Sequence, residues 1–291
     1  MGSVMTASSI TWVSPGNRRV GAGRTASALR WTFLALLAAY FLVPLIAMAR
    51  FAFQSVPTAL LTPETMFTGW GVSGLWSAMT DPIILESVRV SLTLVVLTIV
   101  LNFVLLLPLA VVVEVRSPRT RPALTAVTLL PWVIPPIALV VGVAATFRST
   151  VPWFLASDLS LVPFYAMWSM PFTYRALDNG LRAINARTLY EAGRSLGASL
   201  WTIVFRILIP NLRASMIAAA GLTGALVLGE FAFASLLLKE TLPVMMLVYQ
   251  KGNPRGGLAL ALVVMVLTAA LLWIIVRALR RRGIAVQAAG I

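Results

Sequence analysis

The residue types that most often carry enzyme chemistry are scarce in this chain of 291 residues. It has no cysteine and no histidine, which excludes thiolate nucleophiles, His-based catalytic triads and nearly all zinc or haem sites. Its two lysines, Lys239 and Lys251, lack the flanking Gly and Ser or Thr of a nucleotide-binding loop. We therefore expect no catalytic residue, metal or cofactor in this chain, and any energy-driven work must draw on a partner or an ion gradient.

The composition is that of a membrane protein. Hydrophobic residues make up 59% of the chain and charged residues only 11%, whereas soluble domains carry about 25% charged residues. Intrinsic disorder is excluded because it requires low hydrophobicity. The net charge of +14 would suit a nucleic-acid binder, but long apolar runs would not.

The apolar runs predict an all-α integral membrane protein, because a membrane-spanning helix needs about 20 apolar residues. A cytoplasmic tail (1–30), a transmembrane domain (31–276) and a second cytoplasmic tail (277–291) would follow one another. The fourth run is short and is interrupted by Pro163 and Pro171. The six predicted spans cover about 31–53, 90–113, 123–147, 159–174, 214–238 and 258–276.

The basic residues predict the orientation. With the N-terminus inside, 17 of the 23 basic residues fall on inner segments and 6 on outer ones, and positive charge concentrates on the cytoplasmic side of membrane proteins. Both termini are therefore expected in the cytoplasm.

The loop at about 175–213 is the longest inner connection, and its apolar residues recur at helical spacing. We expect one short helix to end near Leu196, where Gly197 can adopt a left-handed conformation. Ser199 is a suitable N-cap for a second helix, which Pro210 would stop before the fifth span. A compact two-helix element at the inner face results.

This loop resembles the signature of permease subunits of binding-protein-dependent ABC importers, in which Glu-Ala-Ala precedes a Gly and, later, an Ile and Leu-Pro. The chain has Gly193 where the family usually has Ala, and Ile209 where it usually has Leu. Segments 130–137, 171–184 and 228–235 resemble spermidine/putrescine-type permeases, a group that includes iron(III) and 2-aminoethylphosphonate transporters. The signature positions are Glu191, Ala192, Gly193, Gly197, Ile207, Ile209 and Pro210, of which all but Gly193 and Ile209 match the family's residues.

The resemblance implies a type I permease with six spans in the bacterial cell membrane, paired with a second, related permease. The loop would dock on one of the importer's two cytoplasmic ATPase subunits, which bind ATP and Mg, and an extracytoplasmic binding protein would deliver the solute. Glu191 would help to hold the coupling element and Gly197 would permit its turn; otherwise Glu191 is a solvated helix charge. A polyamine is the expected solute, with 2-aminoethylphosphonate, iron(III) or sulfate as alternatives. An ion-gradient-driven transporter or a membrane scaffold is the alternative of another class.

Two features could line the solute path. Glu230 lies inside the fifth apolar run, where a carboxylate is costly and usually faces a cavity or a partner. It could attract a cationic solute, or it could bond another helix. Pro135 and Pro136, with Pro131, could break the third span and expose carbonyl groups to solute, or set a static kink.

Small residues recur every four positions at Gly221, Ala225 and Gly229. Such a stripe allows close contact between helices. It could meet the second permease or pack within this subunit. Trp132 and Trp168 are expected to pack or to anchor at the membrane interface rather than bind a cofactor.

The orientation gives a first testable prediction. The native chain has no cysteine, so Trp70→Cys provides a unique thiol in the predicted outer loop at 58–83. An impermeant thiol reagent should label it in intact cells. Labelling that requires the inner face to be opened would reverse the assigned topology.

Overall fold

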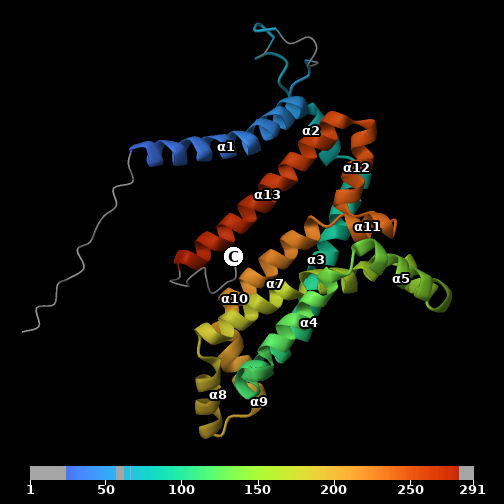
Figure 1. Cartoon of the computed structure of the whole chain (residues 1–291). Coiled ribbons are helices and arrows are strands. Elements are labelled where there is room, and N and C mark those ends of the chain that lie inside the picture. Colours follow the sequence, from blue (N-terminus) through green and yellow to red (C-terminus); the bar gives the residue numbers. More distant parts are fainter. Residues whose placement is uncertain (1–23, 57–61, 66, 282–291) are drawn as a thin grey trace, which may run out of the picture. The chain divides into compact units, whose positions relative to one another are not determined.

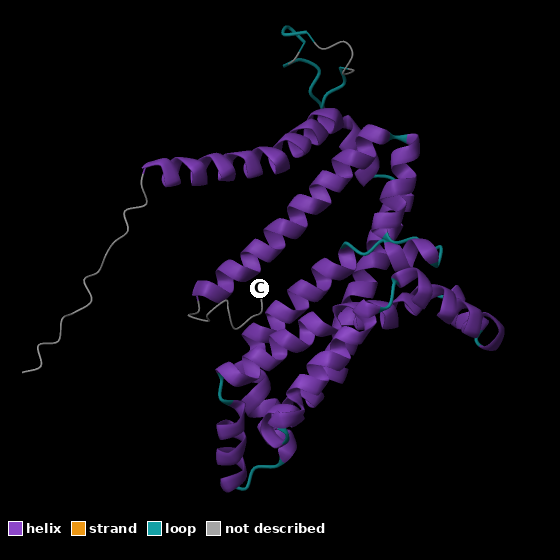
Figure 2. Cartoon of the chain, in the orientation of Figure 1, coloured by secondary structure: helices purple, strands orange, loops and turns teal. Residues whose placement is uncertain are grey.

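The computed structural model describes residues 24–56, 62–65 and 67–281, and nearly all of these are helical (Figures 1 and 2). The chain divides into two units, residues 1–47 and 48–291, each described by itself. Helix α1 (Arg24–Phe53) runs through Pro44 without ending. It begins within the predicted N-terminal tail, most of which lies outside the described residues.

The second unit contains the remaining described helices. Three short segments, η2 (Pro118–Thr120), η3 (Asp158–Ser160) and the π-helical η4 (Ile203–Leu208), lie among them. The α-helices are α2 (Ser73–Met79), α3 (Pro82–Arg116), α4 (Arg121–Val133), α5 (Pro136–Thr150), α6 (Pro152–Ala156), α7 (Leu161–Ala183), α8 (Ala186–Ser195), α9 (Leu200–Thr202), α10 (Ile209–Leu228), α11 (Ala232–Leu236), α12 (Leu242–Gly252) and α13 (Pro254–Arg281).

Local chemistry explains where α3 begins. The Asp81 side chain accepts hydrogen bonds from the backbone N–H groups of Ile83 and Ile84 at 2.9 and 3.3 Å. These donors have no partner within the first helical turn. Pro82 occupies the first helical position, where its missing N–H costs nothing. The helix therefore begins before the predicted Val90.

By length and apolar composition, four helical runs in the described residues could cross a membrane: 29–53, 82–116, 200–236 and 254–278. A fifth is added if the bent pair α4 and α5 counts as one span. The predicted fourth span corresponds to α7, whose second half carries Arg175, Asp178 and Arg182. Most of α7 is buried by protein, so it tolerates polar residues that a lipid-facing helix would not.

Two of the predicted spans contain a break in the helix. The third breaks between α4 and α5, which meet at 85°, because Pro135 and Pro136 supply no backbone N–H groups to continue the hydrogen-bond ladder. The fifth ends at Leu228, and α11 begins two residues after Glu230. The sixth runs from Pro254 to Arg281, into the predicted C-terminal tail; residues 282–291 lie outside the described ranges.

The core of this unit is formed by α3, α7 and α10, which pack on one another (Figure 1). Polar side chains join them inside. The Asn102 amide nitrogen of α3 donates to the Ser169 hydroxyl of α7 at 2.7 Å, and Thr173 of α7 bonds Thr223 of α10 at 2.8 Å. Because a membrane interior offers no water to bond, polar side chains there are satisfied by hydrogen bonds between helices.

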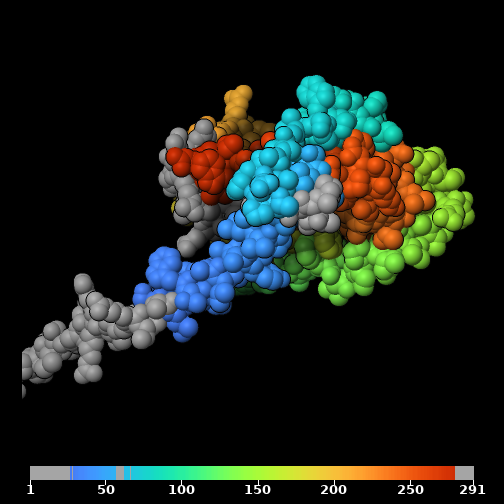
Figure 3. Space-filling model, turned by 90° about the horizontal axis from the view of Figure 1, so that it is seen from above, coloured from blue at the N-terminus to red at the C-terminus, as the bar shows by residue number. Residues whose placement is uncertain are grey.

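Helix α3 connects two ends of the unit. Its N-terminal end lies beside α2 and α12, and the view from above in Figure 3 shows the orange part of the chain that includes α12. Its C-terminal end contacts α8, which lies at the bottom of Figure 1 with α9. The predicted coupling loop therefore occupies one end of the unit.

Candidate coupling site

The turn of the predicted coupling loop has the expected geometry. Helix α8 ends at Ser195, and Gly197 adopts a left-handed conformation with φ of +79°. Its N–H donates to the Arg194 carbonyl at 2.9 Å, and the N–H of Ala198 donates to the Gly193 carbonyl at 3.0 Å. These bonds satisfy carbonyl groups at the helix end. The predictions for Leu196 and Gly197 are confirmed.

The second helix begins as expected but does not stop at Pro210. The Ser199 hydroxyl accepts from the Thr202 N–H at 3.2 Å, which confirms the N-cap. Helical structure then runs through η4 directly into α10, with Pro210 in its first turn. The π-helical segment precedes Pro210, and the Asn211 side chain donates to the Ile207 carbonyl at 2.8 Å. Helical structure therefore continues past Pro210, and the predicted stop is wrong.

Gly193 allows a close contact between the two arms of the turn. A Cβ at this position would lie 2.9 Å from Cγ1 and 3.1 Å from Cδ1 of Ile203. Ala, the residue usual in the resembled signature, would force Ile203 to shift. Gly costs helix stability, under about 1 kcal/mol relative to Ala. In return, α8 packs directly on the buried Ile203.

The inner side of the turn is fixed to the helical bundle. Ala186 and Ile203 are fully buried in one hydrophobic cluster that also holds Leu177 and Leu181 of α7. Ile207 and Ile209 pack against the same cluster. A displacement of the turn must therefore move the ends of α7 and α10 with it.

The outer side of the turn carries charged and apolar groups. The Glu191 carboxylate accepts from Arg187 Nε at 2.9 Å, and both side chains are 60% exposed. Ala192 is exposed as well. Glu191 thus has a partner on the surface of its own helix. The expected role of Glu191 in holding the coupling element rests on this one exposed ion pair, which stabilises a helix by a few tenths of a kcal/mol.

Exposed apolar side chains extend this surface. Leu196 is 88% exposed and Trp201 is 72% exposed. The Trp201 and Phe205 rings stack with centroids 5.4 Å apart. Sequence reasoning used Leu196 only as the end of the first helix and did not select Trp201 or Phe205. Aromatic residues at positions 201 and 205 leave the second helix apolar on more than its buried face. Trp and Phe are enriched at the centres of protein interfaces.

Glu230 lies at the break between α10 and α11 and is only 8% exposed. Its Oε1 accepts from the Phe233 N–H at 2.9 Å and its Oε2 from the Ala234 N–H at 3.4 Å. The carboxylate therefore occupies two backbone donors that the broken helix would otherwise leave unpaired. This geometry favours the structural alternative for Glu230 over a place on the solute path.

The proline break of the third predicted span is fixed to α7 by tryptophan. The Trp132 and Trp168 rings stack with centroids 4.1 Å apart, and Trp132 Nε1 donates to the Trp168 carbonyl at 2.9 Å. Pro135 is extended, with φ of −57° and ψ of 135°. The expected packing role of both tryptophans is confirmed, whereas the place of Pro135 and Pro136 on a path stays a prediction.

The small-residue stripe packs at least partly within this unit. A Cβ at Gly221 would collide with Ile275 of α13, so α10 and α13 approach closely there. A Cβ at Gly229 would face the backbone of its own helix at the Ala225 carbonyl, at 3.4 Å. For Gly221, packing inside the subunit is the observed alternative.

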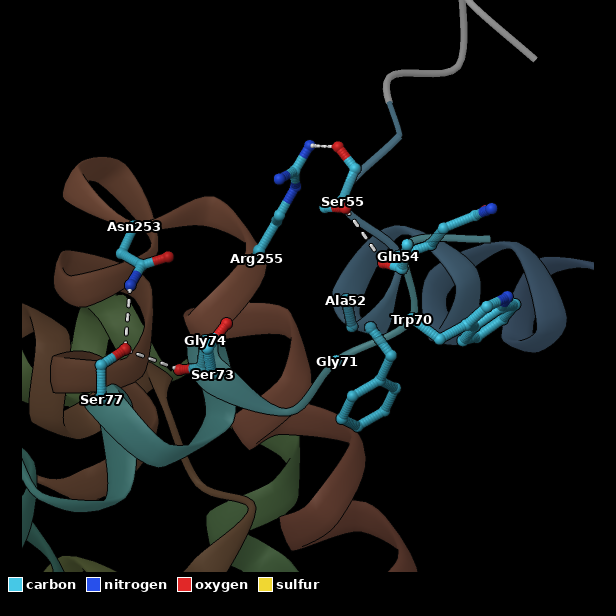
Figure 4. A pocket seen from close by; sticks show the side chains of 12 residues that line it. Ala52, Gln54, Ser55, Trp70, Gly71, Ser73, Gly74, Ser77, Asn253 and Arg255 are labelled. Carbon is cyan, nitrogen blue, oxygen red and sulfur yellow. Dashed lines mark hydrogen bonds between the residues drawn. The ribbon is translucent and has the colours of Figure 1, made fainter. Parts of the chain in front are cut away.

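The end of the unit opposite the coupling turn holds an open polar pocket of about 630 Å³ (Figure 4). The C-terminal end of α1, the start of α2 and the turn between α12 and α13 line it. Arg255 donates to the Ser55 carbonyl at 2.8 Å. No acidic side chain is among the described residues that line this pocket. The labelling position Trp70 lines it, whereas none of the candidate site residues chosen from the sequence is among these lining residues.

Gly197 gives a prediction with a matched control. A Cβ at Gly197 meets nothing within 4 Å, so substitutions there act through the backbone alone. Gly197→Val should disrupt the turn, because a β-branched residue is strongly disfavoured at positive φ, whereas Gly197→Asn should be tolerated. Co-purification of the ATPase expected from the resemblance should fall for Val and persist for Asn. If both variants co-purify equal amounts of the ATPase, the turn is not needed for ATPase docking.

Glu230 gives a second prediction. Glu230→Gln keeps an acceptor for the Phe233 N–H, so assembly and transport should persist. Glu230→Ala leaves the donors of α11 unpaired, which costs about 1–3 kcal/mol for a buried group, and the yield of folded protein should fall. Detergent-solubilised yield and thermal unfolding measure this difference. If the Gln variant loses transport while its yield stays normal, the result supports the alternative in which Glu230 lines the solute path.

Comparison with known proteins shows which family this chain resembles in sequence. Residues 106–284 match the family described as binding-protein-dependent transport system inner membrane component. The chain is 32% identical over 161 residues to a molybdenum transport system permease protein of Azotobacter vinelandii, covering 50% of this chain and 70% of that protein. It is 26% identical over 247 residues to a probable sulfate transport system permease protein of Zygnema circumcarinatum, covering 76% and 81%.

A third relative is a putative 2-aminoethylphosphonate transport system permease protein of Salmonella paratyphi A, 28% identical over 170 residues, with 57% of this chain and 63% of that protein covered. The family match covers more than half of the chain and includes the whole coupling turn. The chain belongs to the family of inner-membrane components of binding-protein-dependent transport systems.

Proposed function

We propose that this chain is the translocation subunit of an ATP-driven importer for a small anion. The single observation that carries the transport mechanism is the exposed turn between α8 and α9, fixed on its inner side to α7 and α10. If a cytoplasmic partner displaces such a turn, the attached ends of α7 and α10 must move with it. The ATPase would contact the surface formed by Arg187, Glu191, Leu196, Trp201 and Phe205, while ATP and Mg would bind in that partner.

Three groups of relatives support an anion as the solute. Their names give molybdenum or molybdate and tungstate, sulfate, and 2-aminoethylphosphonate, and each of these solutes carries an oxyanion or phosphonate group. The polyamine hypothesis came from the resemblance to spermidine/putrescine-type permeases, and Glu230 was one candidate attraction for a cationic solute. That carboxylate is occupied by the backbone N–H groups of Phe233 and Ala234. An anion therefore fits better than a polyamine or iron(III).

The partners follow from the same proposal. Two ATPase subunits and a second permease would complete the membrane complex, with both termini of this chain in the cytoplasm. The polar pocket beside Arg255 lies at the other end of the unit from the coupling turn, so it offers a surface to an extracytoplasmic binding protein.

The test is uptake by the complete complex in proteoliposomes, with ATP inside and the binding protein outside. Radiolabelled molybdate, sulfate and 2-aminoethylphosphonate are the anionic probes, and spermidine is the cationic comparison. We expect ATP-dependent accumulation of one anion, and its loss with a hydrolysis-dead ATPase.

Two outcomes would contradict the proposal in different ways. Accumulation of spermidine, with none of the anions, would restore the polyamine hypothesis. Uptake that persists with the inactive ATPase and follows an imposed ion gradient would instead support a secondary transporter.

A further inference from the structure

A cluster of four charged side chains joins three helices close to the coupling turn. We call it the ion cluster; it consists of Glu114 on α3, Arg121 on α4, and Asp178 and Arg182 on α7. The Arg121 guanidinium contacts Glu114 and also donates through Nε to Asp178 Oδ1 at 2.8 Å. Arg182 Nε lies 3.7 Å from Asp178 Oδ2.

Burial makes the ion cluster more than a surface feature. The side chains of Glu114 and Asp178 are 13% and 10% exposed, and that of Arg121 is 24% exposed. At such sites an ion pair is screened little by salt, and removal of one partner leaves a charge that water cannot fully solvate. Arg121 is suited to the position because its planar fork can bind two carboxylates at once.

The position of the ion cluster links the coupling turn to the proline break. Helix α7 is joined to α8 by a two-residue turn at Ile184 and Asn185, and Leu177 and Leu181 of α7 share a buried cluster with Ile203 of the second arm. Helix α4 packs on α7 and ends at the break before Pro136. At the far end of α4, Trp132 stacks on Trp168 of α7.

Helix α4 is thus attached to α7 at both of its ends, by an ionic contact near the coupling turn and by an aromatic contact near the break. We propose that the Arg121–Asp178 contact is the positioning contact that makes α4, and with it the proline break, follow α7 when the coupling turn moves. This inference rests on the proposed function, and it assigns roles to two residues outside the signature.

The ion cluster supplies its own control, because Arg121 has two carboxylate partners with different consequences. Asp178→Asn removes the ionic attraction between α4 and α7, keeping only a neutral acceptor for Arg121, and leaves Glu114 on Arg121. Glu114→Gln likewise removes the ionic attraction between α3 and α4 and leaves Asp178 on Arg121. Both changes remove one negative charge of similar burial. Arg182→Gln tests the weaker pair within α7, in which Arg182 is 53% exposed.

The experiment measures ATP hydrolysis by the complete complex in proteoliposomes, with and without its binding protein. The binding protein is saturated with molybdate, sulfate or 2-aminoethylphosphonate, whichever of the three it binds. In Asp178→Asn we expect the ratio of stimulated to basal hydrolysis to fall at least threefold, since mutations along coupling networks change coupling by about 2- to 30-fold. Glu114→Gln and Arg182→Gln should keep the wild-type ratio.

A purely structural role gives a different result. Asp178→Asn and Glu114→Gln would then both lower the yield or thermal stability of the complex, and the assembled complexes would keep the wild-type ratio. That outcome overturns the proposal, and so does an equal fall of the ratio in both variants.

If Asp178→Asn does not assemble, Arg121→Lys decides. It keeps a positive charge between the carboxylates but loses the fork, so the ratio should fall while the yield stays near that of wild type; an unchanged ratio contradicts the proposal. A wild-type complex without stimulation by the binding protein would instead show that the proposed function is wrong.

Discussion

The need to satisfy backbone hydrogen bonds without water constrains the described part of this protein. In an apolar layer an unpaired N–H or C=O group costs several kcal/mol, so continuous helices are the default and every interruption requires a substitute partner. Glu230 supplies acceptors at the break before α11. Asn211 serves the carbonyl of Ile207 beside Pro210. The interruptions are therefore the positions where side-chain identity matters most.

The inner core follows a related rule. Helices α3, α7 and α10 are joined by Asn102, Ser169, Thr173 and Thr223, all of them buried. Because lipid offers these groups no alternative partner, such bonds specify which helices meet and in what register. Helix α7 can then carry charged residues near its inner end, where the ion cluster neutralises them. The low apolar content of α7 is tolerated because most of this helix is buried by protein.

Local features were predictable where a short stretch of sequence contains the whole cause. The turn at Gly197 was predictable because glycine readily adopts positive φ. The start of the second helix was predictable because Ser199 is a preferred N-cap residue. The predicted stop at Pro210 is wrong because helical structure passes through the π-helical segment into α10. The sequence left two roles open for Glu230, because its partners, the N–H groups of Phe233 and Ala234, become available only once the helix has broken. Arg121 and Asp178 are far apart in the chain, and neither position suggested the other. The packing of Gly193 on Ile203 likewise needed the fold.

The uninterrupted passage from α9 through η4 into α10 has a mechanical consequence. From Leu200 to Leu228 the chain forms one helical rod, about 43 Å long at 1.5 Å per residue. A tilt of about 5° at its inner end would displace the other end by about 4 Å at that length. The wider π-helical turn lies near the base of this lever. The segment that receives the force and the segment that amplifies it are thus parts of one continuous helical run, which ends at Leu228 before the break at Gly229.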